Sequence, residues 1–79
     1  MKLWFIKRPE SEVDYDTFDS AIVAAETEEE AKTINPCSRG WGYRYTAWTK
    51  SPENVTATYI GMAKDGTERG IILASFNAG

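Results

Sequence analysis

The sequence predicts a small α+β domain: a mainly antiparallel sheet, one short helix packed on one face of it, and a C-terminal β-hairpin. Three observations support this prediction: an apolar N-terminal segment, an apolar run that leads into a capped helix at residues 20–35, and two β-rich segments that flank an Asp-Gly turn. With 79 residues, the chain is expected to form a single domain, residues 1–79, with a small core.

The first predicted strand runs from Lys2 to Arg8, with the sequence K-L-W-F-I-K-R. Its apolar residues fall on both faces of a strand, because neighbouring side chains point in opposite directions, and this pattern is typical of a central strand. Pro9 ends the strand. Residues 10–19 are then expected to form an acidic loop, longer than a tight hairpin requires.

The second predicted strand, Ala21 to Ala25, is a short apolar run that suits a position covered on both faces. A helix follows directly, because Thr27 and Glu30 have the spacing of a capping box and acidic residues fill the first turn. Ala31 is expected to supply part of its narrow buried face, and Pro36 ends the helix region.

The C-terminal half is expected to contribute three strands. Alternating aromatic residues indicate a short strand near residues 43–49, and a turn is expected at residues 51–54. Residues 55–63 and 68–76 flank Asp65-Gly66, which favours a two-residue hairpin. In that register Gly61 lies opposite Gly70, a weak point that suits either a β-bulge or a closely approaching group.

Charge and aromatic content point towards association with other molecules. Residues 10–30 contain nine acidic side chains and no basic one, whereas the remainder of the chain is mildly basic. Ten of the 79 residues are aromatic. One helix leaves the other face of the predicted sheet uncovered unless the aromatic segment or a second subunit covers it, so a homo-oligomer is expected.

Several classes of site are disfavoured by composition. The chain has no histidine, which removes the commonest general base and zinc ligand, and its single cysteine, Cys37, permits neither an intramolecular disulfide nor a two-cysteine metal site. No phosphate-loop, dinucleotide or hydrolase motif is present. We therefore expect no cofactor, no metal and no catalysis; an enzymatic alternative would have to use carboxylate, tyrosine or lysine side chains.

Residues 39–48 combine basic and aromatic side chains that suit an anionic, nucleotide-like ligand. Arginine holds phosphate in a forked geometry, and flat rings stack on nucleobases. The predicted ligand-binding residues are Arg39, Trp41, Tyr43, Arg44, Tyr45 and Trp48. The alternative is that the aromatic rings cover the core while the arginines are solvated.

The acidic loop is a second candidate surface, suited to a basic protein partner. Its predicted partner-binding residues are Asp14, Tyr15, Asp16 and Asp19. Their D-x-D-x-x-D spacing lacks the glycine and terminal glutamate of an EF-hand loop, so a solvated loop is favoured over a cation site. The whole acidic block could also present a phosphate-like surface to a nucleic-acid-binding protein.

Four segments carry a resemblance to known proteins: M-K-L-W at the start, D-Y-D-T-F-D at residues 14–19, A-A-E-T-E-E-E-A at residues 24–31 and I-L-A-S-F-N-A-G at residues 72–79. Together they resemble a group of small, uncharacterised proteins of bacteriophages and bacterial mobile elements.

This resemblance implies a counter-defence factor in the cytoplasm of an infected bacterium. Such a factor would sequester a cyclic nucleotide-type immune signal without turnover or, alternatively, inhibit a host defence enzyme through its acidic surface. The absence of a hydrophobic segment of signal-peptide or membrane-spanning length agrees with that location. A phosphodiesterase-like enzyme acting on the same signal is a third possibility.

Overall fold

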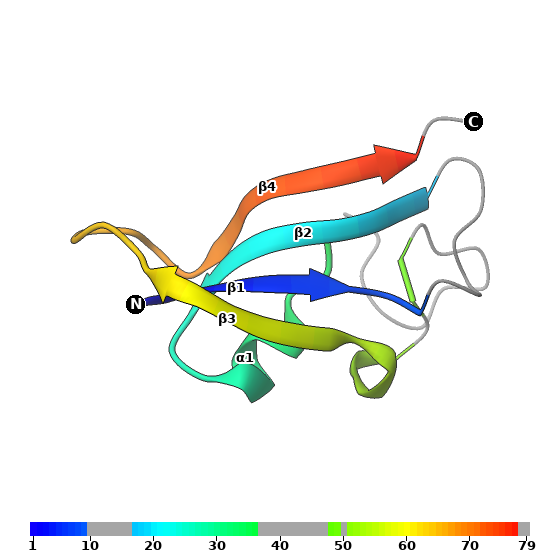
Figure 1. Cartoon of the computed structure of the whole chain (residues 1–79), viewed down its shortest axis with the longest axis horizontal. Helices are drawn as coiled ribbons and strands as arrows, with labels where there is room; N and C mark the ends of the chain where they lie inside the picture. Colours follow the sequence, from blue (N-terminus) through cyan, green and yellow to red (C-terminus); the bar gives the residue numbers. More distant parts are fainter. Residues whose placement is uncertain (10–16, 37–47, 50, 78–79) are drawn as a thin grey trace.

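The computed structural model describes residues 1–9, 17–36, 48–49 and 51–77. For residues 17, 76 and 77 it describes the backbone only. A four-stranded sheet forms one layer, and a single short helix lies below β1 and β3 in the view of Figure 1. In chain order, the elements are β1 (Lys2–Lys7), β2 (Thr17–Ala25), α1 (Glu28–Thr33), the 3₁₀ helix η2 (Pro52–Asn54), β3 (Thr56–Met62) and β4 (Gly70–Asn77).

The sheet has the order β3-β1-β2-β4, and every neighbouring pair is antiparallel. The prediction of a small antiparallel sheet with one short helix is therefore confirmed, as is the central position of the first strand. β2 is also central and includes the predicted buried run. β3 and β4 are the two edge strands (Figure 1).

The predicted C-terminal hairpin is wrong. β3 pairs with β1 and β4 pairs with β2, so the two strands lie at opposite edges of the sheet. The turn itself does form, since the Thr67 backbone N–H donates to the Lys64 carbonyl at 3.1 Å and Gly66 has a φ of +89°. The segment that contains the turn crosses the end of the sheet, where the Ala63 N–H donates to the Met1 carbonyl at 2.8 Å.

The packing of β2 explains this arrangement. A hairpin attached beside β1 would leave β2 at an edge of the sheet, although β2 is the strand whose apolar residues are most completely buried. Placing β4 beside β2 gives both central strands two neighbours. The Asp-Gly turn is a local signal, and burial of the central strands outweighs it.

The glycines expected to oppose each other are separated by two strands. Aligned residues form one row across the sheet, Gly61–Leu3–Ala24–Gly70, so each glycine occupies an edge strand. Register irregularities occur at Ile60 in β3, next to Gly61, and at Ile72 in β4, two residues from Gly70; a further one lies in β2 between Phe18 and Ser20. A bulge near each glycine agrees with the sequence prediction, although their direct pairing does not.

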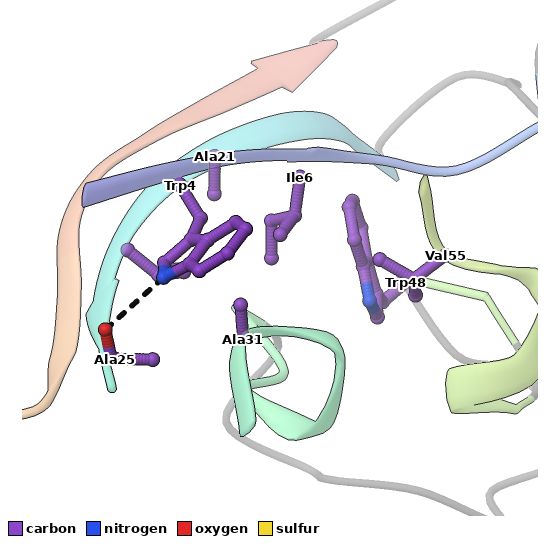
Figure 2. Packing of buried hydrophobic residues seen from close by; sticks show 8 residues of the cluster. Trp4, Ile6, Ala21, Ala25, Ala31, Trp48 and Val55 are labelled. Carbon is purple, nitrogen blue, oxygen red and sulfur yellow. Dashed lines mark hydrogen bonds between the residues drawn. The ribbon is translucent and has the colours of Figure 1, made fainter. Parts of the chain in front are cut away.

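The core lies on one face of the sheet. Figure 2 shows Ile6 between the indole rings of Trp4 and Trp48, with the Ala31 methyl group pointing towards them from α1. The buried cluster comprises Trp4, Ile6, Ala21, Val23, Ala25, Ala31, Trp48 and Val55. Its β1 and β2 members alternate with residues of the opposite face, as strand geometry requires.

Trp4 is held at the margin of this core by two interactions. Its indole N–H donates to the Ala25 carbonyl at 3.0 Å (Figure 2), which satisfies the polar atom of a buried ring. Its ring also meets that of Tyr59 edge to face, with centroids 5.6 Å apart and an interplanar angle of 75°. The contact joins β1 to the edge strand β3.

Half of the predicted capping box is present. The Thr27 hydroxyl accepts the Glu30 backbone N–H at 3.1 Å, as the sequence predicts. The Glu30 carboxylate, however, accepts from the Arg69 guanidinium at 3.2 Å. The helix ends at Thr33, and Ile34 adopts extended backbone and packs against the core.

Three loop predictions meet different outcomes. The acidic loop was expected to reach residue 19, but β2 already begins at Thr17. The strand expected near residues 43–49 falls largely outside the described residues, and Trp48 and Thr49 are not in a strand. The predicted turn at residues 51–54 forms as η2, with the Ser51 hydroxyl accepting the Glu53 N–H at 3.3 Å.

In the part of the chain that the structure describes, no helix has the length and apolarity to span a membrane.

Candidate functional site

An arginine is buried where β1 ends. Arg8 is only 5% exposed, and strand alternation places it on the same face as Trp4 and Ile6. Its Nη1 donates to the Trp48 carbonyl at 3.4 Å. Because arginine stays ionised at all physiological pH values, the burial of Arg8 places a fixed positive charge at this end of the sheet.

A short, buried stretch of chain lies against this arginine. Trp48 and Thr49 are each 1% exposed, and Trp48 belongs to the core cluster. The Asn54 side-chain amide donates to the Thr49 hydroxyl at 3.2 Å, and Val55 is buried beside them. The segment is therefore held by both apolar contacts and hydrogen bonds.

The flanks of the two candidate segments meet here. The arginine- and aromatic-rich segment ends at Trp48, and on its other side Ile34 packs against the same core. The acidic segment is flanked by Arg8 and Asp19, where the Arg8 backbone N–H donates to the Asp19 carbonyl at 3.5 Å. Arg8 thus contacts the flank of each segment, one through its backbone and the other through its side chain.

The structure describes one of the six predicted ligand-binding residues, Trp48. Its ring is enclosed by the core, so Trp48 presents no open face on which a base could stack, and the prediction for this residue is corrected to a core role. The other five lie outside the described residues: Arg39, Trp41, Tyr43, Arg44 and Tyr45. The alternative of a core role therefore holds for the C-terminal end of the segment.

Of the predicted partner-binding residues, the structure describes Asp19 alone. Its side chain is half-buried and accepts a hydrogen bond from the Ser20 hydroxyl at 3.1 Å. The other three, Asp14, Tyr15 and Asp16, lie outside the described residues. Asp19 belongs to β2 rather than to a loop, so its carboxylate is positioned by the sheet.

Sequence reasoning did not select Arg8 as a site residue. A usable signal was present, because alternation along K-L-W-F-I-K-R places Arg8 with the two most buried side chains of the strand. A basic residue in phase with a core face is uncommon, and its burial requires an electrostatic explanation.

The described residues offer little that could hold a metal ion. Within the ranges listed above, no three His, Cys, Asp or Glu side chains come together as a potential metal site. Cys37 lies outside those ranges. Arg8 contributes a hydrogen bond that fixes the Trp48 backbone to the end of β1.

Comparison with protein-family models, with curated protein sequences and with solved structures gave no significant match.

Proposed function

We propose that this chain is a non-catalytic binding protein that captures a small anionic ligand of the cyclic nucleotide type. In this proposal Arg39 and Arg44 hold the phosphates, and the rings of Trp41, Tyr43 and Tyr45 stack on the bases. Trp48 supports the segment from within the core. The resemblance to phage proteins suggests counter-defence in the cytoplasm of an infected bacterium as the setting.

The observation that carries the proposal is the hydrogen bond from Arg8 to the Trp48 carbonyl. It attaches the C-terminal end of the segment that contains Arg39 and Arg44 to the end of β1.

The anchoring of the flanks also supports the proposal. Ile34 and Trp48 both contact the core, so the segment between them is attached to the core at both ends. Binding residues are often placed in this way, on a connection that a packed scaffold holds at both ends.

A calorimetric titration with a matched pair of variants tests the proposal. A thermal-shift screen with cyclic di- and trinucleotides, cyclic ADP-ribose isomers and linear nucleotides first identifies a ligand, since a ligand specific for the folded state raises the melting temperature. Arg44→Ala is then expected to weaken binding at least tenfold. Arg69→Ala removes the same charge from a side chain that is 61% exposed and pairs with Glu30, and it should leave affinity unchanged.

Equal affinity for wild type and Arg44→Ala, or no ligand in the panel, would reject nucleotide capture by this segment. Mass spectrometry of the ligand released by denaturation distinguishes capture from turnover. An intact ligand supports sequestration, whereas an altered ligand supports the phosphodiesterase-like alternative.

A second candidate, inhibition of a basic host protein, is favoured by the exposed acidic surface of the described chain. Glu26, Glu28 and Glu29 are all exposed, and they continue the acidic block begun by the segment before β2. Opposite charges across such an interface accelerate association and are screened by salt. This candidate predicts a complex that weakens steeply with salt and with the double change Asp14→Asn and Asp16→Asn, while Arg44→Ala leaves it intact.

A further inference from the structure

The turn in the connection between β3 and β4 contains a chemically reactive pair of residues. Asp65 and Gly66 occupy its two central positions, and the Thr67 N–H and hydroxyl both donate to the Lys64 carbonyl, at 3.1 and 2.6 Å. An aspartate followed by glycine can close a five-membered ring with the next peptide nitrogen, because glycine has no Cβ to obstruct the approach. In a folded chain this reaction depends on whether the Asp65 Cγ and the Gly66 nitrogen are able to meet.

The structure leaves both reacting groups accessible. Asp65 and Gly66 are exposed. Among the described residues, none accepts a hydrogen bond from the Gly66 N–H and none donates one to the Asp65 carboxylate. A Cβ placed on Gly66 would meet no atom within 4 Å beyond its chain neighbours. Neither hydrogen bonding nor packing against the rest of the described chain therefore holds the two groups apart.

Asn54 shows how the fold blocks the same type of reaction elsewhere. The N–H that would attack its side chain, that of Val55, donates to the Pro52 carbonyl at 3.1 Å. The Asn54 amide itself donates to the hydroxyl of the buried Thr49 at 3.2 Å. Both reacting groups are engaged, and the β-branched valine adds steric hindrance.

Asp19 provides a closer comparison, because it is also an aspartate followed by a small residue. It lies in the central strand β2, where Ser20 is aligned with Lys7 of β1 on one side and with Ser75 of β4 on the other. The Ser20 hydroxyl donates to the Asp19 carboxylate at 3.1 Å. Ring closure would rotate the peptide unit between the two residues and break the pairing of a central strand. The sheet therefore protects Asp19, whereas the turn does not protect Asp65.

We propose that Asp65 is a site of spontaneous isoaspartate formation in the folded protein. The Gly66 nitrogen attacks Cγ of the Asp65 carboxyl group, an N–Cγ bond forms, and the carboxyl hydroxyl leaves as water with the amide hydrogen. Water then adds to one of the two carbonyls of the ring. Cleavage at the backbone carbonyl of Asp65 leaves the chain running through Cγ, which is isoaspartate, and cleavage at Cγ restores aspartate. Water is the only other reactant.

The product changes the turn in which it forms. Isoaspartate inserts an additional CH₂ group into the main chain and places the carboxylate directly on Cα. The Lys64 carbonyl and the Thr67 N–H and hydroxyl then lose the spacing that closes the turn, so both hydrogen bonds to this carbonyl weaken. The modification thus loosens the connection between the two edge strands and leaves the pairing of β1 with β2 intact. The inference is independent of the proposed ligand.

Incubation of the full chain in neutral buffer, once folded and once in concentrated urea, tests the proposal. Peptide mapping and labelling by an isoaspartyl methyltransferase measure isoaspartate at each position. Residue 65 is expected to convert at rates of the same order in both states, and residue 19 only in urea. Conversion of residue 65 in urea alone, or no conversion in either state, would overturn the proposal. Equal conversion of residues 19 and 65 in the folded chain would contradict the protective role of the sheet on which the comparison rests.

Two variants of the exposed turn position check the chemistry. Asp65→Glu retains the carboxylate but would have to close a six-membered ring, so the isoaspartyl signal at this position should be lost. Asp65→Asn forms the same five-membered ring with release of ammonia, and it should convert faster than the wild type to a mixture of aspartate and isoaspartate. Thermal denaturation confirms that both variants are folded. A signal that persists in Asp65→Glu, or a folded Asp65→Asn variant that retains its amide, would contradict ring closure at Gly66.

Discussion

The Arg8 guanidinium donates a hydrogen bond to the carbonyl of Trp48, forty positions away in the sequence. Through this bond the end of β1 is tied to the only described part of the arginine- and aromatic-rich segment. The bond is 3.4 Å long, so the position of Arg8 depends as much on its burial as on this contact. Arg8 is therefore a structural residue that fixes one end of the candidate segment.

Replacement of Arg8 should be costly. Arg8→Ala removes a buried side chain and its charged hydrogen-bond donor, so we expect the free energy of unfolding to fall by about 2–4 kcal/mol. Urea denaturation followed by tryptophan fluorescence measures this change. Arg69→Ala, at an exposed ion pair, should cost no more than about 1 kcal/mol. Equal losses for the two variants would contradict the structural role of Arg8.

Neighbouring residues of β1 should differ in their contribution to stability. Ile6 is fully buried between two tryptophan rings, so Ile6→Ala is expected to lower the free energy of unfolding by about 2–5 kcal/mol. Phe5 is half-buried on the opposite face, and Phe5→Ala should cost less, because part of the ring is already solvated. A larger loss for Phe5→Ala than for Ile6→Ala would contradict the assignment of the core to the face that carries Ile6.

The N-cap of α1 can be tested by a conservative pair. Thr27→Ala removes the hydroxyl that accepts the Glu30 N–H and should cost about 1 kcal/mol of unfolding free energy. Thr27→Ser retains the acceptor oxygen and is expected to stay within a few tenths of the wild-type value. Thermal or urea denaturation measures both, and an identical loss for alanine and serine would exclude a capping contribution.

The sheet order can be tested by paired cysteines in a Cys37→Ser background. Ser20 and Ser75 are aligned partners of β2 and β4, at a separation that antiparallel pairing makes compatible with a disulfide. The double variant Ser20→Cys, Ser75→Cys should therefore form an intramolecular disulfide under mild oxidation. The control pair Ile60→Cys, Ile71→Cys follows the hairpin register and should not, because two strands lie between β3 and β4. If only the control pair formed a disulfide, the result would contradict the observed sheet order and support direct pairing of β3 with β4.

Much of the local structure could be predicted from the chain itself. The apolar faces of β1, the buried run in β2, the Thr27 cap and the Asp65-Gly66 turn all depend on residues close together in sequence, and each is present. For the candidate site, the sequence identified the segment of residues 39–48 but not how its side chains are arranged in space. Its end at Trp48 proved to be core, which depends on residues distant in sequence. The burial of Arg8 could have been inferred from strand alternation, but its contact with Trp48 could not.

The sequence by itself determined most of the local elements: the apolar runs of β1 and β2, the start of the helix, and a small antiparallel sheet that contains the strands. Only the tertiary structure decided the partners of the last two strands, because a turn specifies a change of direction and not the strand that a segment joins. Burial of β2 from both sides required β4 beside it, and this placed an uncharged apolar strand at the edge of the sheet. The same long-range packing brought Arg8 to Trp48, since only a folded core can position two residues so distant in the chain.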